Sequence, residues 1–219
     1  MQSVFLHILP LLLGAAVSPV AAVGMIAVLT SKDSPRLKGL VYLLGATFPL
    51  IVAGFVIAFF FNKVPTPNTT KPIGSWIDII AGIVLLGLAV KNFLHHTTKK
   101  PKAKQKVQHT LGYSKTFFLG IGLMLTNFTT LIVFIPAAKD IAISSLDSMQ
   151  KLAVLGVSLI VVMSLIALPL VIDFVFPRGS NELLERLRDW MLSHNKSIER
   201  IVLIVFGIYL LIKGFGVFA

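Results

Sequence analysis

The 219-residue sequence contains no cysteine and little charge. Without thiols it has no disulfide framework, no thiol redox relay and no cysteine zinc site. Charged residues make up 13% of the chain, about half the share typical of soluble domains, and 56% of the residues are apolar. Uncharged stretches of more than twenty residues recur. This composition predicts an integral membrane protein with no room for a separate soluble catalytic domain.

Six apolar segments are long enough to be transmembrane helices, since a bilayer crossing needs about 20 apolar residues. The third and sixth are the weakest, because charged residues leave only twelve uncharged positions in each. The first lacks a basic leader and is too long for a signal peptide, so we expect it to stay in the mature protein. The segments are Val4–Thr30, Gly39–Phe61, Ser75–His95, Thr116–Ala138, Leu152–Val175 and Ile201–Phe218.

Lys and Arg are distributed unevenly over the predicted loops, and this asymmetry predicts orientation. The loops after the first, third and fifth helices hold fifteen of them with their flanks, and the opposite side holds five. We therefore expect a multi-pass membrane protein with both termini outside. The lysine-rich segment 97–115 is expected to contact anionic lipid headgroups in the cytoplasmic leaflet. The net charge of +11 is thus attributed to topology and membrane lipids, not to nucleic acid.

Two further segments have simple interpretations. Residues 180–194 place Leu183, Leu187 and Trp190 on one helical face and charged residues on the other, which predicts an interfacial helix. His95, His96 and His109 lie in a lysine-rich loop without nearby carboxylates, so we predict no metal site there. Nothing resembles a phosphate-binding loop, a serine elbow or a carboxylate pair. We expect neither catalysis nor a cofactor.

The two halves of the chain show weak internal similarity. Residues 75–93 match residues 197–215 at five of nineteen positions, and residues 14–20 align with 122–128. Because each repeat would contain three helices, the second copy must be inverted relative to the first. We therefore predict an all-α, polytopic membrane protein of six helices in an inverted 3+3 repeat. The repeats would be 1–96 and 116–219, joined by the basic linker 97–115.

Helix breakers fall near the middle of three predicted helices. Pro19 removes a backbone donor and leaves the carbonyl of Ala15 without its helical partner. In hydrocarbon such a group must face protein, water or ligand. The alternative is that the prolines are ordinary kinks and that the threonines and the asparagine between 126 and 130 form hydrogen bonds between helices. The substrate-binding residues predicted at this depth are Ser18, Pro19, Pro49, Thr126, Asn127, Thr129 and Thr130.

Four charged residues lie within the predicted helices. Charge inside a membrane suggests a role in gating or ion coupling, although snorkelling from the helix ends would also explain it. We predict that Lys91 and Asp173 pair at the cytoplasmic mouth and that Asp78 and Lys213 lie near the outer surface.

The six-helix layout, the break Val17-Ser-Pro19 and the spacing from Gly120 to Asn127 resemble the LysE superfamily of small exporters. Within it, the chain looks most like the GAP or Sap group, the glycopeptidolipid- and sulfolipid-addressing proteins, which are implicated in moving lipids to the bacterial surface. The amino-acid exporters of the superfamily typically have Pro-Gly-Pro and Asn-Pro-Lys at these two positions. The resemblance therefore implies a lipid or amphipathic substrate, not an amino acid.

The resemblance implies a transporter or flippase-like exporter of the bacterial plasma membrane that works by alternating access. One alternative is a proton-coupled exporter of a small polar solute or cation. Another is a non-transporting scaffold for a lipid-synthesis or secretion complex. A site open sideways to lipid would favour the first reading, a closed polar cavity the second, and no cavity the third. A homo-oligomer is compatible with all three.

The charge asymmetry generates a direct test of orientation. In this naturally cysteine-free chain, a cysteine replacing Pro67 should react with an impermeant thiol reagent in intact cells, and one replacing Lys102 should not. Labelling at Lys102 and not at Pro67 would reverse the predicted topology.

Overall fold

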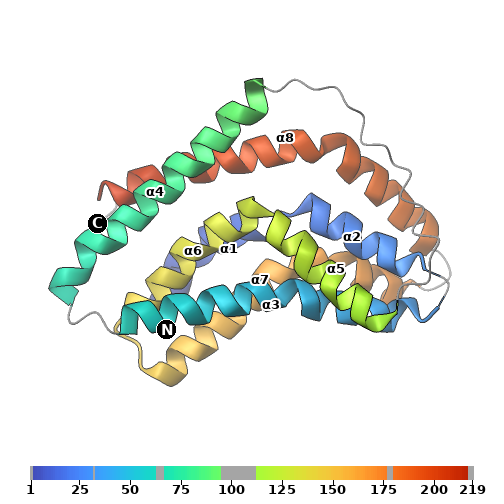
Figure 1. The fold of residues 1–219 in the computed structure, drawn as a ribbon, viewed down its shortest axis with the longest axis horizontal. Helices are drawn as coiled ribbons and strands as arrows, with labels where there is room; N and C mark the ends of the chain where they lie inside the picture. The colour runs from blue at the N-terminus through green and yellow to red at the C-terminus, as the bar shows by residue number, and fades with distance from the viewer. Residues whose placement is uncertain (1, 32, 63–66, 95–111, 177–179, 217–219) are drawn as a thin grey trace.

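The computed structural model describes residues 2–31, 33–62, 67–94, 112–176 and 180–216. These residues form eight α-helices and no strand (Figure 1). The helices are α1 (Gln2–Ala16), α2 (Pro19–Leu29), α3 (Pro35–Asn62), α4 (Pro67–Leu94), α5 (Tyr113–Thr126), α6 (Phe128–Ile143), α7 (Ser148–Val175) and α8 (Ser180–Gly214).

Several helices are long and apolar enough to cross a bilayer. Three qualify alone, at Pro35–Phe61, Gly74–Leu94 and Ser148–Val175, and two bent pairs raise the number in the described chain to as many as five. Large apolar side chains point outward from different helices, including Leu44 at 65% exposure and Ile160 at 71%. Lipid is the solvent that suits such a surface, and the chain is an all-helical, multi-pass membrane protein.

The helix boundaries differ from the sequence-based ones in several places. The predicted first and fourth helices are each broken, by bends of 58° between α1 and α2 and 77° between α5 and α6. Where we expected an interfacial helix at 180–194 and a separate helix from Ile201, the structure has the single helix α8. No glycine or proline lies between Asn181 and Val205 to interrupt it. Helix α4 begins at Pro67, since proline is well suited to a first helical position.

Helices α4 and α8 form an antiparallel pair at one side of the fold (Figure 1). Their glycines bring the two backbones together. A Cβ added at Gly82 would lie 2.9 Å from the carbonyl oxygen of Gly207, and one at Gly214 would lie 3.0 Å from that of Ser75. Arg200 donates to the carbonyl of Asn92 at 3.4 Å further along the same pair. This close packing makes the pair one structural unit.

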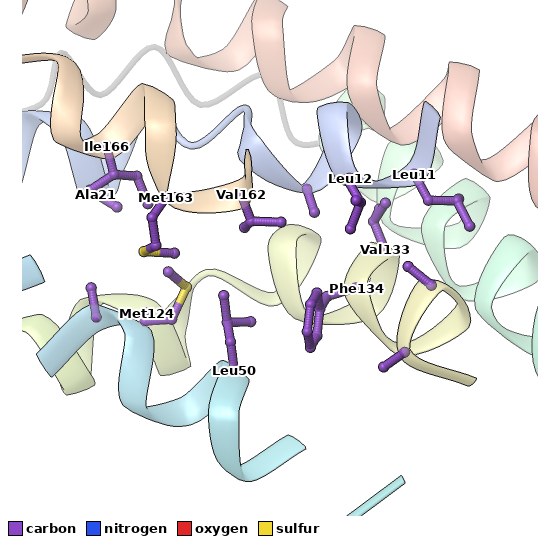
Figure 2. Close-up of a cluster of buried hydrophobic side chains, with 14 of the residues drawn as sticks. Leu11, Leu12, Ala21, Leu50, Met124, Val133, Phe134, Val162, Met163 and Ile166 are labelled. Atoms are coloured by element: carbon purple, nitrogen blue, oxygen red, sulfur yellow. The ribbon is translucent and has the colours of Figure 1, made fainter. Parts of the chain in front are cut away.

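The other six helices enclose the largest part of the apolar core. Figure 2 shows Leu50 of α3, Met124 of α5 and Met163 of α7 pointing toward one another, with Phe134 of α6 nearby. All four side chains are at most 5% exposed. Tyr42 of α3 also donates its hydroxyl to the carbonyl of Ala21, at 2.8 Å, and so ties α3 to the first turn of α2. The core therefore holds both broken helices in fixed positions.

Helix α3 crosses α5 at two glycines. A Cβ at Gly45 would lie 2.2 Å from the carbonyl oxygen of Phe117, and one at Gly120 would lie 2.4 Å from that of Tyr42. Both obstacles are backbone atoms, which cannot rotate away. Small residues allow this close approach of helices in a membrane, where packing replaces the hydrophobic driving force.

We predict that Gly120→Ala destabilises the protein by about 1–3 kcal/mol, because the added methyl group overpacks the crossing. Gly122 lies on the same helix, and a Cβ there meets nothing within 4 Å. Gly122→Ala should therefore be neutral or stabilising by up to about 1 kcal/mol, from helix propensity alone. Thermal unfolding of the two purified variants checks the difference. Equal melting temperatures would contradict the role of the crossing.

Candidate functional site

The first break separates α1 from α2 at Val17 and Ser18. Pro19 is the first residue of α2 and supplies no backbone N–H. The carbonyl of Ala15, predicted to lose its helical donor, accepts a hydrogen bond from the hydroxyl of Thr130 at 2.9 Å. Both groups are buried. A side chain of α6 thus satisfies the backbone group that the proline leaves free.

The second break lies at Asn127, between α5 and α6. The side-chain amide nitrogen of Asn127 donates to the hydroxyl oxygen of Ser18 and, at 2.8 Å, to that of Thr130. The backbone N–H of Asn127 still bonds to the last turn of α5, to the carbonyls of Leu123 and Met124 at 3.1 Å each. The two breaks are therefore joined through one amide and two hydroxyl groups.

A cavity of about 270 Å³ lies beside the joined breaks, and we call it the break cavity. Two faces of it come from the breaks themselves, and the third comes from the α4–α8 pair. Amides, hydroxyls, one lysine and one glutamate line it together with aliphatic and aromatic groups. The lining residues are Val17, Ser18, Pro19, Val20, Leu88, Lys91, Asn92, Thr126, Asn127, Phe128, Thr129, Asn195, Glu199 and Val202.

A second polar feature is the charge cluster of Asp78, Lys139, Asp140 and Lys213, from α4, α6 and α8. Lys139 lies 2.6 Å from Asp78 and 3.0 Å from Asp140, measured between side-chain nitrogen and oxygen. Lys213 pairs with Asp140 and lies 3.6 Å from Asp78. All four side chains are at most 11% exposed. Opposite charges thus alternate within a buried, formally neutral group.

A family model described as "Sap, sulfolipid-1-addressing protein" matches residues 8–216. The chain belongs to this family. The match spans both breaks, the break cavity and the charge cluster. No curated protein and no solved structure matches the chain.

The Sap-family structure brings most of the predicted site residues together. Ser18, Pro19, Thr126, Asn127 and Thr129 all line the break cavity, as does Lys91 from the predicted gating set. Thr130 does not line the cavity, and its hydroxyl donates to the carbonyl of Ala15. Pro49 is buried within the uninterrupted helix α3 and does not line this cavity.

Three polar lining residues were not among the predicted site residues. Asn92 follows Lys91 on α4, whereas Asn195 and Glu199 lie one turn apart on α8. The signal that could have found the last two is their helical spacing with Val202, at i, i+4 and i+7. It was hidden because the sequence placed Asn195 and Glu199 in a loop.

The predicted pair of Lys91 and Asp173 is wrong. Asp173 instead accepts from the guanidinium group of Arg36 at 3.0 Å, and Arg36 also donates to the Asp173 backbone carbonyl at 3.2 Å. In the part of the chain that the structure describes, α4 and α7 are not packed together. Lys91 lies on α4, which packs on α8, whereas Asp173 lies on α7 and pairs with α3.

Asp78 and Lys213 have partners that the sequence did not indicate. They do not snorkel to a surface but pair with Lys139 and Asp140 inside the fold. The sequence had ended the fourth helix at Ala138, so these two partners fell in a predicted loop. Because α6 begins at Phe128 and continues to Ile143, both lie in a helix. The histidines His95, His96 and His109 lie outside the described residues.

We predict that Thr130→Val lowers the free energy of unfolding by about 1–2 kcal/mol, because it removes the donor to Ala15 and an acceptor of the Asn127 amide. The control is Thr126→Val, because among the described residues the Thr126 hydroxyl bonds only to the carbonyl of Leu123 in its own helix, at 2.9 Å. Thermal denaturation of both variants measures the difference. A loss as large in Thr126→Val would mean that the link between the breaks adds no stability.

Proposed function

We propose that this Sap-family protein moves a lipid or another amphipathic molecule across the plasma membrane. The observation that carries the proposal is the mixed lining of the break cavity. Asn92 and Asn195 offer amide groups to a polar headgroup, and Asn127 offers its amide oxygen. Val20 and Phe128 line the same cavity while remaining 45% and 63% exposed. Apolar side chains that are exposed beside a polar cavity suit a site that opens sideways to lipid.

The size of the cavity narrows what enters it. Sites that enclose whole drug-sized ligands usually have volumes of about 300–1,000 Å³. A cavity of about 270 Å³ fits a headgroup or part of one, but not the acyl chains as well. The chains would stay in the bilayer, beyond Val20 and Phe128. This arrangement is the one expected for headgroup passage with the tails outside the protein.

The packing of the helices supports the proposed inverted repeat. Under this relation α1–α2 corresponds to α5–α6, α3 to α7 and α4 to α8, with α8 as the sixth span. Helices α3 and α7 each have 28 residues. Helix α3 packs on both parts of α5–α6, and α7 packs on both parts of α1–α2. The bond from Asn127 to Ser18 joins neighbouring positions of the two halves, because Ser18 aligns with Thr126 and Pro19 with Asn127.

Alternating access would follow from movement of the α4–α8 pair against the other helices. The pair forms one wall of the break cavity and is itself tightly packed at its glycines. In the related architecture of small exporters, a shared site lies where two inverted halves meet. The resemblance to the LysE superfamily and the family's sulfolipid-addressing description both support export of a lipid.

Two other functions remain as competing hypotheses with different structural requirements. A proton-coupled exporter of a small polar solute would need a closed polar cavity, whereas exposed apolar side chains line this one. A scaffold for a lipid-synthesis or secretion complex would need no cavity. We further propose that segment 97–115, of which residues 97–111 lie outside the described chain, contacts anionic headgroups.

The test compares the surface-exposed lipids of cells with and without the gene. We expect loss of the gene to remove a lipid class from the surface and to leave it inside the cell. Wild-type protein should restore it, and Thr126→Trp should not, because the indole would fill the break cavity.

The matched control is Ile160→Trp, which introduces the same indole at a position that is 71% exposed on α7 and outside the cavity. It should restore the surface lipid fully. Unchanged surface lipids in cells without the gene would refute lipid export. Equal rescue by the two tryptophan variants would instead mean that the break cavity is not on the path.

A further inference from the structure

The charge cluster lies at one level of the fold, well separated from the break cavity. Along α4, Asp78 precedes Lys91 by thirteen residues, a distance of about 20 Å along the helix axis. Along α6, Lys139 follows Thr129 by ten residues, or about 15 Å, and along α8, Lys213 follows Val202 by eleven, or about 16 Å. The charged residues of α4, α6 and α8 therefore lie on the same side of the break cavity.

Apolar side chains occupy the space between these two levels. Leu85 of α4, Val133 of α6 and Leu210 of α8 have no exposed surface. A groove of about 210 Å³ between α4 and α6 is lined only by apolar residues, among them Ile80 and Ile135. Helices α4 and α6 thus leave a gap along their middle and meet tightly at the charge cluster.

The cluster joins the α4–α8 pair to α6. Lys139 contributes most of this connection, because it pairs with Asp78 at 2.6 Å and donates to the carbonyl of Gly74 at 3.1 Å. Lys213 adds the second link, through Asp140. One carboxylate oxygen of Asp78 is buried with no hydrogen-bond partner among the described residues. The cluster therefore contains several ion pairs but leaves one buried carboxylate oxygen without a hydrogen bond.

Burial of four charges is weak evidence for stability alone. Desolvation of the ions offsets much of their attraction, and apolar replacements of buried ion pairs are often neutral or stabilising. Separating the ions, however, exposes each to water, which recovers its hydration. A contact of this kind can hold two units together in one state and release them in another, which suits a two-state element.

We propose that the charge cluster is the closed gate at one end of the lipid path, and that, of the two ends of the fold, the break cavity is open only toward the one that carries Lys91. The inference rests on the proposed function, and it specifies how access to the same site is controlled. When the ion pairs of Lys139 and Lys213 separate, the α4–α8 pair moves away from α6 and the cavity opens toward the cluster. The apolar layer then becomes the path.

Thiol labelling tests the gate without any transport measurement, since the chain contains no native cysteine. The reporter is Thr129→Cys, at the wall of the break cavity. Two exposed turns mark the faces of the membrane, Asp33→Cys after α2 and Ser145→Cys after α6. These turns follow helices that run to opposite ends of the fold (Figure 1). An impermeant reagent is applied to each face of sealed, oriented vesicles.

We expect Thr129→Cys to react from the face of the Asp33 marker and not from that of the Ser145 marker. Combining Asp78→Asn with Lys139→Gln should raise labelling from the Ser145 face by about tenfold, equivalent to about 1.4 kcal/mol less preference for the closed state. The control combines Glu182→Gln with Arg186→Gln, an exposed ion pair within α8, and should change nothing. Thermal unfolding verifies that each labelled variant is folded.

A complementary experiment closes the gate covalently. Cysteines at Gly74 and Ile143, where a Cβ on Gly74 lies 3.6 Å from the Ile143 side chain, are joined by a short bifunctional thiol reagent. Cross-linked protein should lose the rescue of surface lipid, whereas the same variant without the reagent should retain it. This variant also keeps the proposal testable if the neutralised one does not fold.

The outcomes separate the two proposals. Labelling of Thr129→Cys from the Ser145 face before neutralisation, or unchanged labelling afterwards in a folded variant, would overturn the gate. Continued lipid export by the cross-linked protein would also overturn it and leave lipid export standing. If wild-type protein affects no surface lipid but neutralisation opens the second face, the gate stands and the lipid function fails.

Discussion

The hydrogen bond from Thr130 to the carbonyl of Ala15 meets the requirement on which the rest of the structure depends. A backbone group freed in the hydrocarbon core costs several kcal/mol unless it finds a partner. Pro19 creates such a group in the first helix, and a residue 115 positions later supplies the donor. The second broken helix therefore has to lie against the first, with its own break at the same depth.

This constraint explains why a small membrane protein has a cavity among its helices. Two breaks that face each other cannot pack as closely as two continuous helices, and the α4–α8 pair covers the space that they leave. Asn127 is central because its amide donates to both Ser18 and Thr130. The alternative of interhelical bonding is thus correct for this amide group, although the residue also lines the break cavity. Structural and functional roles coincide at one side chain.

Polar groups elsewhere in the fold follow the same physical rule. Asp78, Lys139, Asp140 and Lys213 are tolerated in an apolar interior because each has a partner of opposite charge. Arg36 and Asp173 form a separate pair between α3 and α7, where the side chain of Arg36 also lies 5.1 Å from the ring of Phe174. Glycines make the remaining contacts close, at the crossing of α3 with α5 and between α4 and α8. Polar links and small residues together replace a hydrophobic effect that lipid does not provide.

The sequence by itself determined the class of the protein, the positions of most helices and the carbonyl that Pro19 leaves free, because composition, apolar runs and proline act locally. It also selected six of the residues that line the break cavity, Lys91 among them as a gating residue. Only the tertiary structure decided that Asn195 and Glu199 of α8 complete that cavity, that Asp173 pairs with Arg36, and that Lys139 and Asp140 enclose Asp78 and Lys213. These partners are 61 to 137 residues apart, and helix packing brings them together. The sequence shows that a charged side chain in the membrane needs a partner of opposite charge, but the packing of the helices decides which residue is close enough to pair with it.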